Sequence, residues 1–460
     1  MTIYTTEHGK TNDIPSKKLK GLTLNTLKGI SAFRKEKEGV LEFRKKAFDV
    51  WETTKEPHWS FDYTIDYKNI YPFSQPDGSI ESKERVEKVL QRLNIDIKEQ
   101  KRIKNIALDF VLDSVSLSTM DMELYNEYGI IFCSLGEALE KFSDLVMQYL
   151  NTVVPINDNY FASLNSAFFS DGTFVYVPKE VHCPVDISSY FRLDSLFASQ
   201  FERTLIIAEE GSFLNYLEGC SAPVSKNNQL HSAVVEIIIK KNAVVNYHTL
   251  QNWYAGNEKG EGGIYNFVTK RGICHEGAEL NWTQVELGSS FTWKYPSTVL
   301  LGDNSKTTFF SLAYTQNKML TDTGTKAIHL GKNTKSYIVS KSIVDGESKN
   351  TFRFKIKVSP NATNSSSTSI CDSLIKSSTS QSFSLPHFEI NSSDFKNKHE
   401  AKTYKIDAEI LFWLKTKGFD SLQSDKLLLS VFSFDIISKL PDEFYSEVFG
   451  LLEMKIEGNG

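Results

Sequence analysis

Hydrophobic and β-branched residues recur in short runs between about residues 201 and 371, and tight turns separate these runs. Each turn is a Gly or Asn followed by a small residue, and the turns lie 27 to 35 residues apart. Gly and Asn tolerate the left-handed backbone of a tight turn, and a small residue after them restarts an extended strand. A loose period of this length, with almost no helical spacing, predicts a β-solenoid. The turns are Gly211-Ser212, Asn242-Ala243, Gly277-Ala278, Asn304-Ser305, Asn333-Thr334 and Asn361-Ala362.

The chain before residue 150 has helical spacing instead. Apolar residues from Val40 to Trp51 predict an amphipathic helix over about 36–53, and a second helix is expected to end near residue 94. Residues 61–80 are expected to be extended. Ser134 and Glu137 form a capping-box pattern ahead of one further helix.

Helical spacing returns near residue 405, after a segment rich in Ser, Thr and Asn over 359–382. We interpret that segment as irregular solenoid rungs with polar ladders. Gly418 is expected to end one C-terminal helix and Ser424 to cap the next. The predicted organisation is a mobile N-terminus (1–20), an α-rich domain (21–152), a parallel β-helix core (153–400) and a helical C-terminal domain (401–460).

Composition narrows the function classes. The net charge of −5 argues against a nucleic-acid partner, which requires a clustered basic surface. We expect no membrane insertion, because no apolar run approaches the roughly 18 residues of a transmembrane helix. The N-terminus has no apolar core of a secretory signal. The five cysteines are widely spaced and odd in number, which predicts free thiols in a reducing compartment.

Four residues carry candidate chemistry. Cys220 in YLEGC is either a small buried apolar side chain or, as a thiolate, an acceptor of persulfide sulfur. The His399-Glu400 pair is either solvated surface or, if the fold brings it near Cys371, part of an iron site. Phosphate-loop, nucleophile-elbow, zinc-protease and dinucleotide motifs are missing from the sequence, which argues against an ATPase or a dehydrogenase.

Long collinear stretches resemble the SufB/SufD family of iron–sulfur cluster assembly scaffolds, and its SufB members in particular. They cover most of the chain from about residue 22 and include VVPINDNYFASLNSAFFSDGTFVYVPK (153–179), QFERTLIIAEEGSFLNYLEGCSAP (200–223), NWTQVELGSSFTWKYPS (281–297) and CDSL (371–374). SufD members share the fold but differ in the YLEGC and QNWY stretches.

The resemblance implies a right-handed parallel β-helix flanked by helical domains, in a complex with SufD (or a second SufB) and the SufC ATPase. It implies a non-enzymatic scaffold whose C-terminal helices dock SufC, in a bacterial cytoplasm or a plastid stroma. The transient cofactor would be the iron–sulfur cluster under assembly, and flavin binding stays open.

The resemblance also implies roles for individual residues. Cys220 would accept persulfide sulfur from a cysteine desulfurase and its sulfur shuttle. Cys371, His399 and Glu400 would hold the nascent cluster at the interface with SufD. Residues that would line or support the sulfur path are Arg192, Glu202, His231, Thr249, Gln251, Trp253 and Lys270.

The sequence departs from the family pattern at Asp194, where the family usually has Asn, and in the segment 376–384. An N-terminal cysteine motif of some bacterial SufB proteins is missing too. Two other functions are alternatives: a polysaccharide-active enzyme, by analogy with other β-helices, and an inert structural solenoid. The enzyme would require paired carboxylates in a cleft.

Overall fold

The computed structural model describes residues 16–58, 63–76, 106–116, 120–193, 199–222, 224–225, 227–406 and 408–456. The expected helix ending near residue 94 lies outside these residues. So does most of the segment 1–20, of which Ser16–Leu19 form strand β1, paired antiparallel with β2 (Phe73–Pro76).

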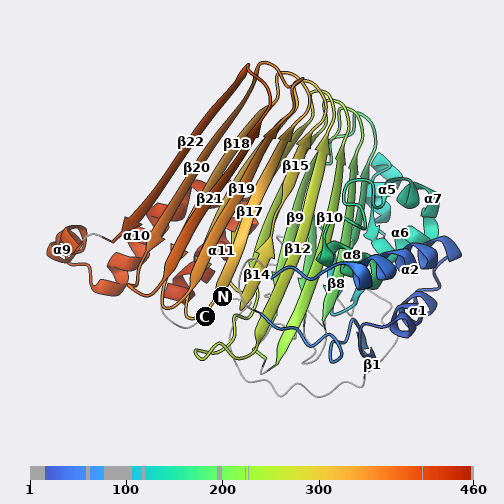
Figure 1. The fold of residues 1–460 in the computed structure, drawn as a ribbon, viewed down its shortest axis with the longest axis horizontal. Coiled ribbons are helices and arrows are strands. Elements are labelled where there is room, and N and C mark those ends of the chain that lie inside the picture. The colour runs from blue at the N-terminus through green and yellow to red at the C-terminus, as the bar shows by residue number, and fades with distance from the viewer. Residues whose placement is uncertain are drawn as a thin grey trace.

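Two 10-stranded sheets face each other and form the predicted β-solenoid (Figure 1). The chain passes from one sheet to the other at each turn, so most strands pair in parallel with the strand two elements further on. We call the sheets the β10 sheet and the β9 sheet, and the space between them the lumen. The mainly β architecture with helices at both ends is confirmed.

The β10 sheet contains β5 (Ile131–Ser134), β6 (Thr173–Val177), β8 (Gln200–Ala208), β10 (Asn228–Ile239), β12 (Gly263–Cys274), β14 (Phe291–Lys294), β15 (Ser297–Leu300), β17 (Leu320–His329), β19 (Lys349–Val358) and β21 (Gln381–Ile390). The β9 sheet contains β3 (Ile106–Leu112), β4 (Val115–Ser116), β7 (Asp186–Arg192), β9 (Phe213–Ser221), β11 (Val244–Asn252), β13 (Glu279–Glu286), β16 (Lys306–Thr315), β18 (Lys335–Val344), β20 (Ser365–Ile375) and β22 (Phe395–Lys405). Strand β3 thus joins the solenoid from the region expected to be an α-rich domain, and β22 runs five residues beyond the expected limit of the core at residue 400.

The turn residues have the backbone that the repeat predicts. Five predicted positions have φ between 56° and 68°: Gly211, Asn242, Gly277, Asn304 and Asn333. The sixth prediction, Asn361, is wrong, because the left-handed residue of that turn is Asn364 (φ 52°). The side chain of Asn364 donates to Asn333 Oδ1 (2.8 Å), and Asn333 donates to Asn304 Oδ1 (3.2 Å). This ladder of asparagines fixes which residue makes the turn.

Helices cover part of the outer face of each sheet. On the β10 sheet, Phe161 of α8 stacks on Phe267 with ring centroids 3.7 Å apart, and helices α1, α2, α6 and α7 extend this cover. On the β9 sheet, α10 and α11 pack against β9 to β20. The N-terminal helices are α1 (Leu24–Phe33), α2 (Glu38–Thr53), α5 (Met122–Tyr128), α6 (Leu135–Lys141), α7 (Ser143–Tyr149) and α8 (Tyr160–Phe168). The C-terminal helices are α9 (Ala408–Thr416), α10 (Ser421–Ile437) and α11 (Asp442–Ile456). Among the described residues, no helix combines the length and apolarity that a bilayer crossing requires.

Two helix predictions need correction. Ser134 caps a helix as expected, but Glu137 accepts from Met120 N and the helix breaks at Phe142 into α6 and α7. Ser424 does not cap α10. The cap is Asp420, which forms a capping box with Gln423, because the chain turns into the helix one residue after Phe419.

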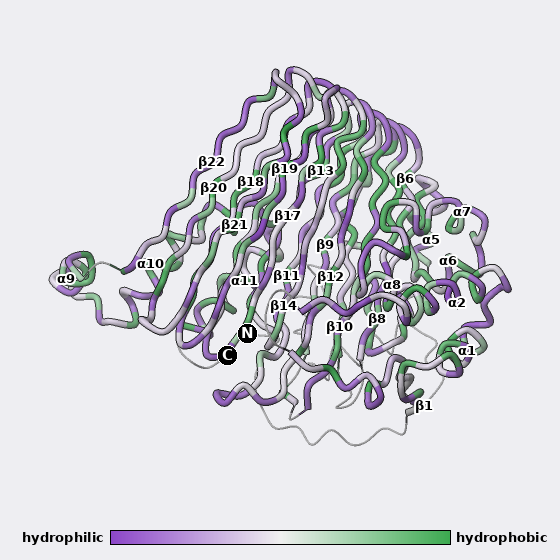
Figure 2. The backbone as a smooth tube through the Cα atoms, in the orientation of Figure 1, coloured by the Kyte–Doolittle hydropathy of each residue, from purple (hydrophilic) through white to green (hydrophobic). Residues whose placement is uncertain are grey.

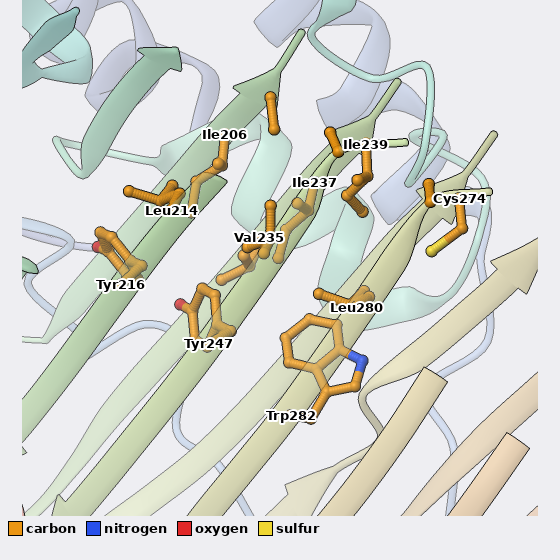
Figure 3. Close-up of a cluster of buried hydrophobic side chains, with 14 of the residues drawn as sticks. Ile206, Leu214, Tyr216, Val235, Ile237, Ile239, Tyr247, Cys274, Leu280 and Trp282 are labelled. Carbon is orange, nitrogen blue, oxygen red and sulfur yellow. The ribbon is translucent and has the colours of Figure 1, made fainter. Parts of the chain in front are cut away.

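The lumen is apolar along the side next to the repeating turns. Figure 3 shows Leu214, Tyr247, Leu280 and Trp282 of the β9 sheet packed against Ile237 and other aliphatic side chains of the β10 sheet. These side chains are almost entirely buried. Burial of this apolar surface, at about 25 cal/mol per Å², is the main force holding the two sheets together.

The Ser-rich segment is built around one regular strand, β20, with a turn on each side, rather than around irregular rungs. Its expected polar ladders are present: Ser336 donates to Ser367 (2.8 Å) and Ser342 donates to Ser373 (2.9 Å) across neighbouring strands. Figure 2 accordingly shows mostly white and purple along β20 and β22. The C-terminal end of the solenoid is therefore held more by hydrogen bonds and less by apolar packing than the N-terminal part.

Candidate functional site

Cys220 lies on β9 and is 1% exposed. It packs in the lumen against Phe191, Trp253 and Ile264. Only glycine fits at the preceding position, Gly219, because a Cβ there would lie 2.5 Å from the ring of Tyr190 on β7. The Glu-Gly-Cys sequence therefore places a carboxylate and a thiol in the lumen while an aromatic ring covers the outer side of the strand.

A buried ion pair lies beside the thiol. Lys270 Nζ is 2.5 Å from Glu218 Oε1, Tyr247 donates to Glu218 Oε2, and Lys270 also lies 3.2 Å from Thr249 Oγ1. Burial alone would raise the pKa of Glu218, but the charges of Lys270 and Lys294 and the hydrogen bonds lower it. Glu218 is therefore a carboxylate, 4.0 Å from Cys220 Sγ.

A chain of amides leads from the thiol to a second carboxylate. Gln251 Nε2 lies 3.8 Å from Cys220 Sγ, and Gln251 Oε1 accepts from Asn266 Nδ2 (2.7 Å). Asn266 Oδ1 is 2.7 Å from His231 Nδ1, and His231 Nε2 is 3.3 Å from Glu202 Oε1. All these side chains are buried, so the network is shielded from water.

The network disfavours a thiolate at rest. Burial raises the pKa of the Cys220 thiol well above its usual value, and the charges of Glu218 and Glu202 raise it further. Burial likewise raises the pKa of Glu202. Sulfur acceptance at this position therefore requires both an opening to the donor and the loss of the thiol proton.

The structure brings together all the predicted sulfur-path residues except Arg192. Trp253 completes the group, its ring centroid 4.6 Å from that of His231. Arg192 is next to Phe191 on β7, so its side chain points to the outer face, where Nη1 lies 3.5 Å from Ser221 Oγ. Arg192 does not line the lumen in this structure.

Cys371 lies near the other end of the solenoid, on β20, and is 4% exposed. Burial raises its pKa to about 12, although the nearby Ser384 hydroxyl acts in the opposite direction. All five cysteines are free thiols, as predicted.

The His399-Glu400 pair is divided between two faces of β22. His399 pairs with Ser369 in register, its Nδ1 3.0 Å from Ser369 Oγ, and so shares the lumen face with Cys371. Glu400 points to the opposite face, where it pairs with Lys402. The structure therefore brings Cys371 and His399 to one face of adjacent strands but turns the Glu400 carboxylate away from them.

The register of the β9 sheet connects the two cysteine regions. One row of buried, mostly polar side chains occupies matching positions on six successive strands: Glu218, Thr249, Gln284, Ser311, Ser340 and Cys371. Within the row, Gln284 Nε2 donates to Ser311 Oγ (3.0 Å). Because neighbouring strands lie about 4.8 Å apart, the row spans about 24 Å. We call this set the polar row.

Comparison with known families identifies the chain. Residues 191–432 match the SufBD core domain of the SUF system for FeS cluster assembly, and residues 34–187 match the SufBD N-terminal region. The chain belongs to the SufBD family.

Sequence relatives of this SufBD protein support the same family assignment. An iron–sulfur cluster assembly SufBD family protein, slr0074 of Synechocystis, is 47% identical over 95% of this chain and 94% of its own length. The chloroplastic protein ABCI8 of Arabidopsis thaliana is 45% identical over 99% of this chain and 84% of its own. The iron–sulfur cluster assembly protein SufB of Plasmodium falciparum is 39% identical over 95% of this chain and 93% of its own.

Family membership makes iron–sulfur cluster assembly the function of this SufBD protein. The geometry of the described residues also gives no support to the polysaccharide-active alternative. Its chemistry needs paired carboxylates in a cleft open to substrate, whereas Glu202 and Glu218 are buried in the lumen.

Several polar lumen residues were not predicted as site residues. Glu218 could have been identified, because alternation along a strand puts it on the same face as Cys220. Asn266 and the buried pair Lys294 and Glu286 (2.5 Å) gave no signal, because they lie on other strands and join the site only through the sheet register.

Proposed function

We propose that this SufBD protein accepts sulfur at Cys220 as a persulfide and delivers it through the lumen to Cys371, where the cluster is built. The sulfur comes from a cysteine desulfurase through its sulfur shuttle. The chain is the scaffold, and ATP hydrolysis takes place in its partner SufC.

The polar row supports this proposal. It begins at Glu218, two residues from Cys220, and ends at Cys371. Its members are buried, so sulfur in transit would be shielded from thiols in solution. The lumen residues Glu202, His231, Thr249, Gln251, Trp253 and Lys270 support the entry end, and Arg192 supports the strand that carries it from outside.

The transfer chemistry also defines what the scaffold needs from elsewhere. A thiolate of Cys220 attacks the terminal sulfur of the donor persulfide, and the donor leaves as a thiolate. The transferred sulfur is at the zero oxidation level, whereas cluster sulfide is at −2. Two electrons must therefore come from an external reductant, of the reduced-flavin or dithiol class.

The cluster end is open to a partner. Apolar side chains of β21 are exposed there, namely Phe383, Leu385, Phe388 and Ile390. SufD or a second copy of the chain would cover this surface and complete the iron site with Cys371, His399 and a reoriented Glu400. The exposed aromatic residues Phe412 (64%) and Trp413 (58%) of α9 would dock SufC.

The plastid and cyanobacterial relatives favour a plastid stroma or a bacterial cytoplasm as the location.

The test is anaerobic assembly with SufC, SufD, the desulfurase and the sulfur shuttle, followed by iron and acid-labile sulfide analysis. Cys371→Ala should lose both iron and sulfide yet still carry persulfide on Cys220, detected by mass spectrometry. The matched control is Cys274→Ala, which removes another fully buried thiol from the apolar part of the lumen. Normal cluster yield in Cys371→Ala, or persulfide only on other cysteines, would refute the proposal.

A further inference from the structure

Three potential metal ligands converge around the sulfur entry point. A carboxylate oxygen of Glu202, one of Glu218 and Cys220 Sγ all lie within 4.8 Å of one another. All three side chains are at most 1% exposed. An acidic cluster alone does not make a metal site, so the surrounding groups decide the question.

The orientation of His231 is the first such observation. Because Asn266 Nδ2 donates to Gln251, Asn266 Oδ1 is the acceptor for His231 Nδ1–H (2.7 Å). In the neutral imidazole, the other ring nitrogen, Nε2, then carries a lone pair, and it faces Glu202. Metal-ligating histidines have this arrangement, with the second ring N–H donated to an oxygen that fixes the tautomer.

The second observation is that the Glu202 carboxylate lacks hydrogen bonds. Within the described part of the chain, neither carboxylate oxygen of Glu202 has a hydrogen-bond partner, and neither does His231 Nε2, although the two groups lie 3.3 Å apart. Buried polar atoms are nearly always satisfied, and unpartnered atoms at a cluster of donors point to a ligand-binding position. A cation between these atoms would satisfy both groups.

The net charge of the cluster agrees in sign and size with binding of one divalent cation. With both carboxylates and the Cys220 thiolate ionised, the cluster carries three negative charges. Lys270, which contacts Glu218, offsets one of them. The other buried lysine of the lumen, Lys294, is paired with its own carboxylate, Glu286. The remaining charge of −2 is neutralised by one divalent cation.

We propose that Cys220, Glu218 and Glu202, joined by His231 through its contact with Glu202, form a binding site for one divalent transition-metal ion of the borderline class, such as Fe²⁺ or Zn²⁺. Thiolate, imidazole and carboxylate are the donors that such ions take in four-coordinate sites. Binding replaces the Cys220 S–H bond with a metal–sulfur bond and releases one proton to solvent, with no change in oxidation state. This site is separate from the cluster site proposed at Cys371.

A bound metal ion would offset the effect of burial, which favours the thiol form of Cys220 over the thiolate. A bound divalent cation holds the sulfur as a thiolate in a lumen that otherwise favours the thiol. The idea that the metal ion occupies the sulfur entry point in the resting state rests on the proposed function. Metal binding itself does not depend on that function.

Co²⁺ is a suitable probe, because a bound thiolate gives it a charge-transfer absorption band. The full chain in a Cys371→Ala background is titrated anaerobically with Co²⁺. We expect one ion per chain and a thiolate band that disappears in Cys220→Ser. Cys274→Ser is the control and should keep the band. Glu202→Gln should bind the ion more weakly.

A positioning variant tests the orientation of the imidazole. Asn266→Ala should lower Co²⁺ affinity about 10- to 100-fold, the usual effect of removing the partner of a ligating histidine. Thermal unfolding of each variant shows whether it is folded. A lack of Co²⁺ binding in the folded Cys371→Ala protein, or a band that survives Cys220→Ser, would overturn this proposal. Persulfide formation on Cys220 in the unsubstituted chain is measured separately, so failure of the metal site and failure of sulfur acceptance are distinguishable.

Discussion

Lys270 Nζ lies 2.5 Å from Glu218 Oε1, and neither side chain is more than 1% exposed. Lys270→Met would leave the carboxylate buried without its cation, which should lower the free energy of unfolding by about 3–5 kcal/mol. The double variant with Glu218→Gln should recover most of this loss. Urea denaturation of the full chain measures both effects.

A surface pair provides the control for that prediction. Lys241 and Glu276 lie 3.0 Å apart, but their side chains are 48% and 56% exposed. Lys241→Met should change the free energy of unfolding by no more than about 1 kcal/mol. Equal effects of Lys270→Met and Lys241→Met would contradict the view that the lumen pair is shielded from water.

Interrupting the polar row should separate sulfur acceptance from sulfur delivery. Gln284→Leu replaces the amide that donates to Ser311 Oγ with an alkyl group of similar volume. We expect normal persulfide on Cys220 but only a small fraction of the normal acid-labile sulfide in the assembled protein. Thr307→Val, a buried substitution on β16 beside the apolar part of the lumen, is the control. Equal sulfide in the two variants would exclude the row as the route.

The cysteines should react with iodoacetamide in a definite order. Cys183 is half-buried and its pKa is raised by burial to about 11, whereas Cys220 and Cys274 are fully buried. The thiolate is the reacting form, so labelling of Cys183 should accelerate about tenfold per pH unit below pH 11. Peptide mass spectrometry should find Cys220 and Cys274 unlabelled until the chain unfolds. Early labelling of Cys220 would show that the free chain already exposes its entry point.

His329 should make stability depend on pH. Its ring is buried between Thr334 Oγ1 (2.8 Å) and Ser336 Oγ (3.0 Å), and burial lowers its pKa from 6.5 to about 4. Between pH 6.5 and 4 the ring is therefore protonated in the unfolded chain but not in the folded chain. The contribution of His329 to the free energy of unfolding is fully present above pH 6.5 and is lost as the pH falls towards 4. This group accounts for about 3 kcal/mol over that interval.

The variant His329→Gln tests the assignment, because Gln can hydrogen-bond but does not titrate. Its unfolding free energy should fall less steeply between pH 6.5 and 4 than that of the unsubstituted chain. Some slope will remain, since burial also lowers the pKa of His248 to about 4. An unchanged slope would show that His329 is protonated in the folded protein.

The exposed aromatic residues of α9 should be needed for partner binding and not for folding. The described residues of α9 include no buried side chain. Replacing Phe412 and Trp413 with Ser should abolish capture of SufC while changing the free energy of unfolding by no more than about 0.5 kcal/mol per site. Tyr337→Ser, an exposed aromatic substitution on β18, should leave SufC capture intact. Undiminished capture by the α9 variant would place the SufC surface elsewhere.

The solenoid could be predicted because its turns obey a local rule. A left-handed residue at a tight turn must be Gly, Asn or a similar residue, and that requirement is visible in the sequence. The choice between Asn361 and Asn364 was not local. It depends on which asparagine meets Asn333 in the neighbouring turn. Ser424 and Asp420 present the same problem, since both can cap a helix and the tertiary path of the chain selects one.

The candidate site was predictable only in part. Resemblance pointed to Cys220 and the lumen residues around it, and strand alternation adds Glu218. The surroundings that set the charge of the thiol come from strands far apart in sequence, as with Asn266. Glu400 shows that neighbours in sequence need not share a site. It follows His399 directly, and side chains that are adjacent in a strand point to opposite faces of β22.

The two ends of the solenoid also differ in what they offer to another subunit. At the N-terminal end the outermost strands, β4 and β5, are short and pair antiparallel with their neighbours. At the C-terminal end, β21 and β22 are edge strands of 10 and 11 residues. Short edges resist strand addition, whereas long edges invite it. Within the described residues only the C-terminal end is receptive, so two chains that join through this end would form a discrete pair and not a growing fibre.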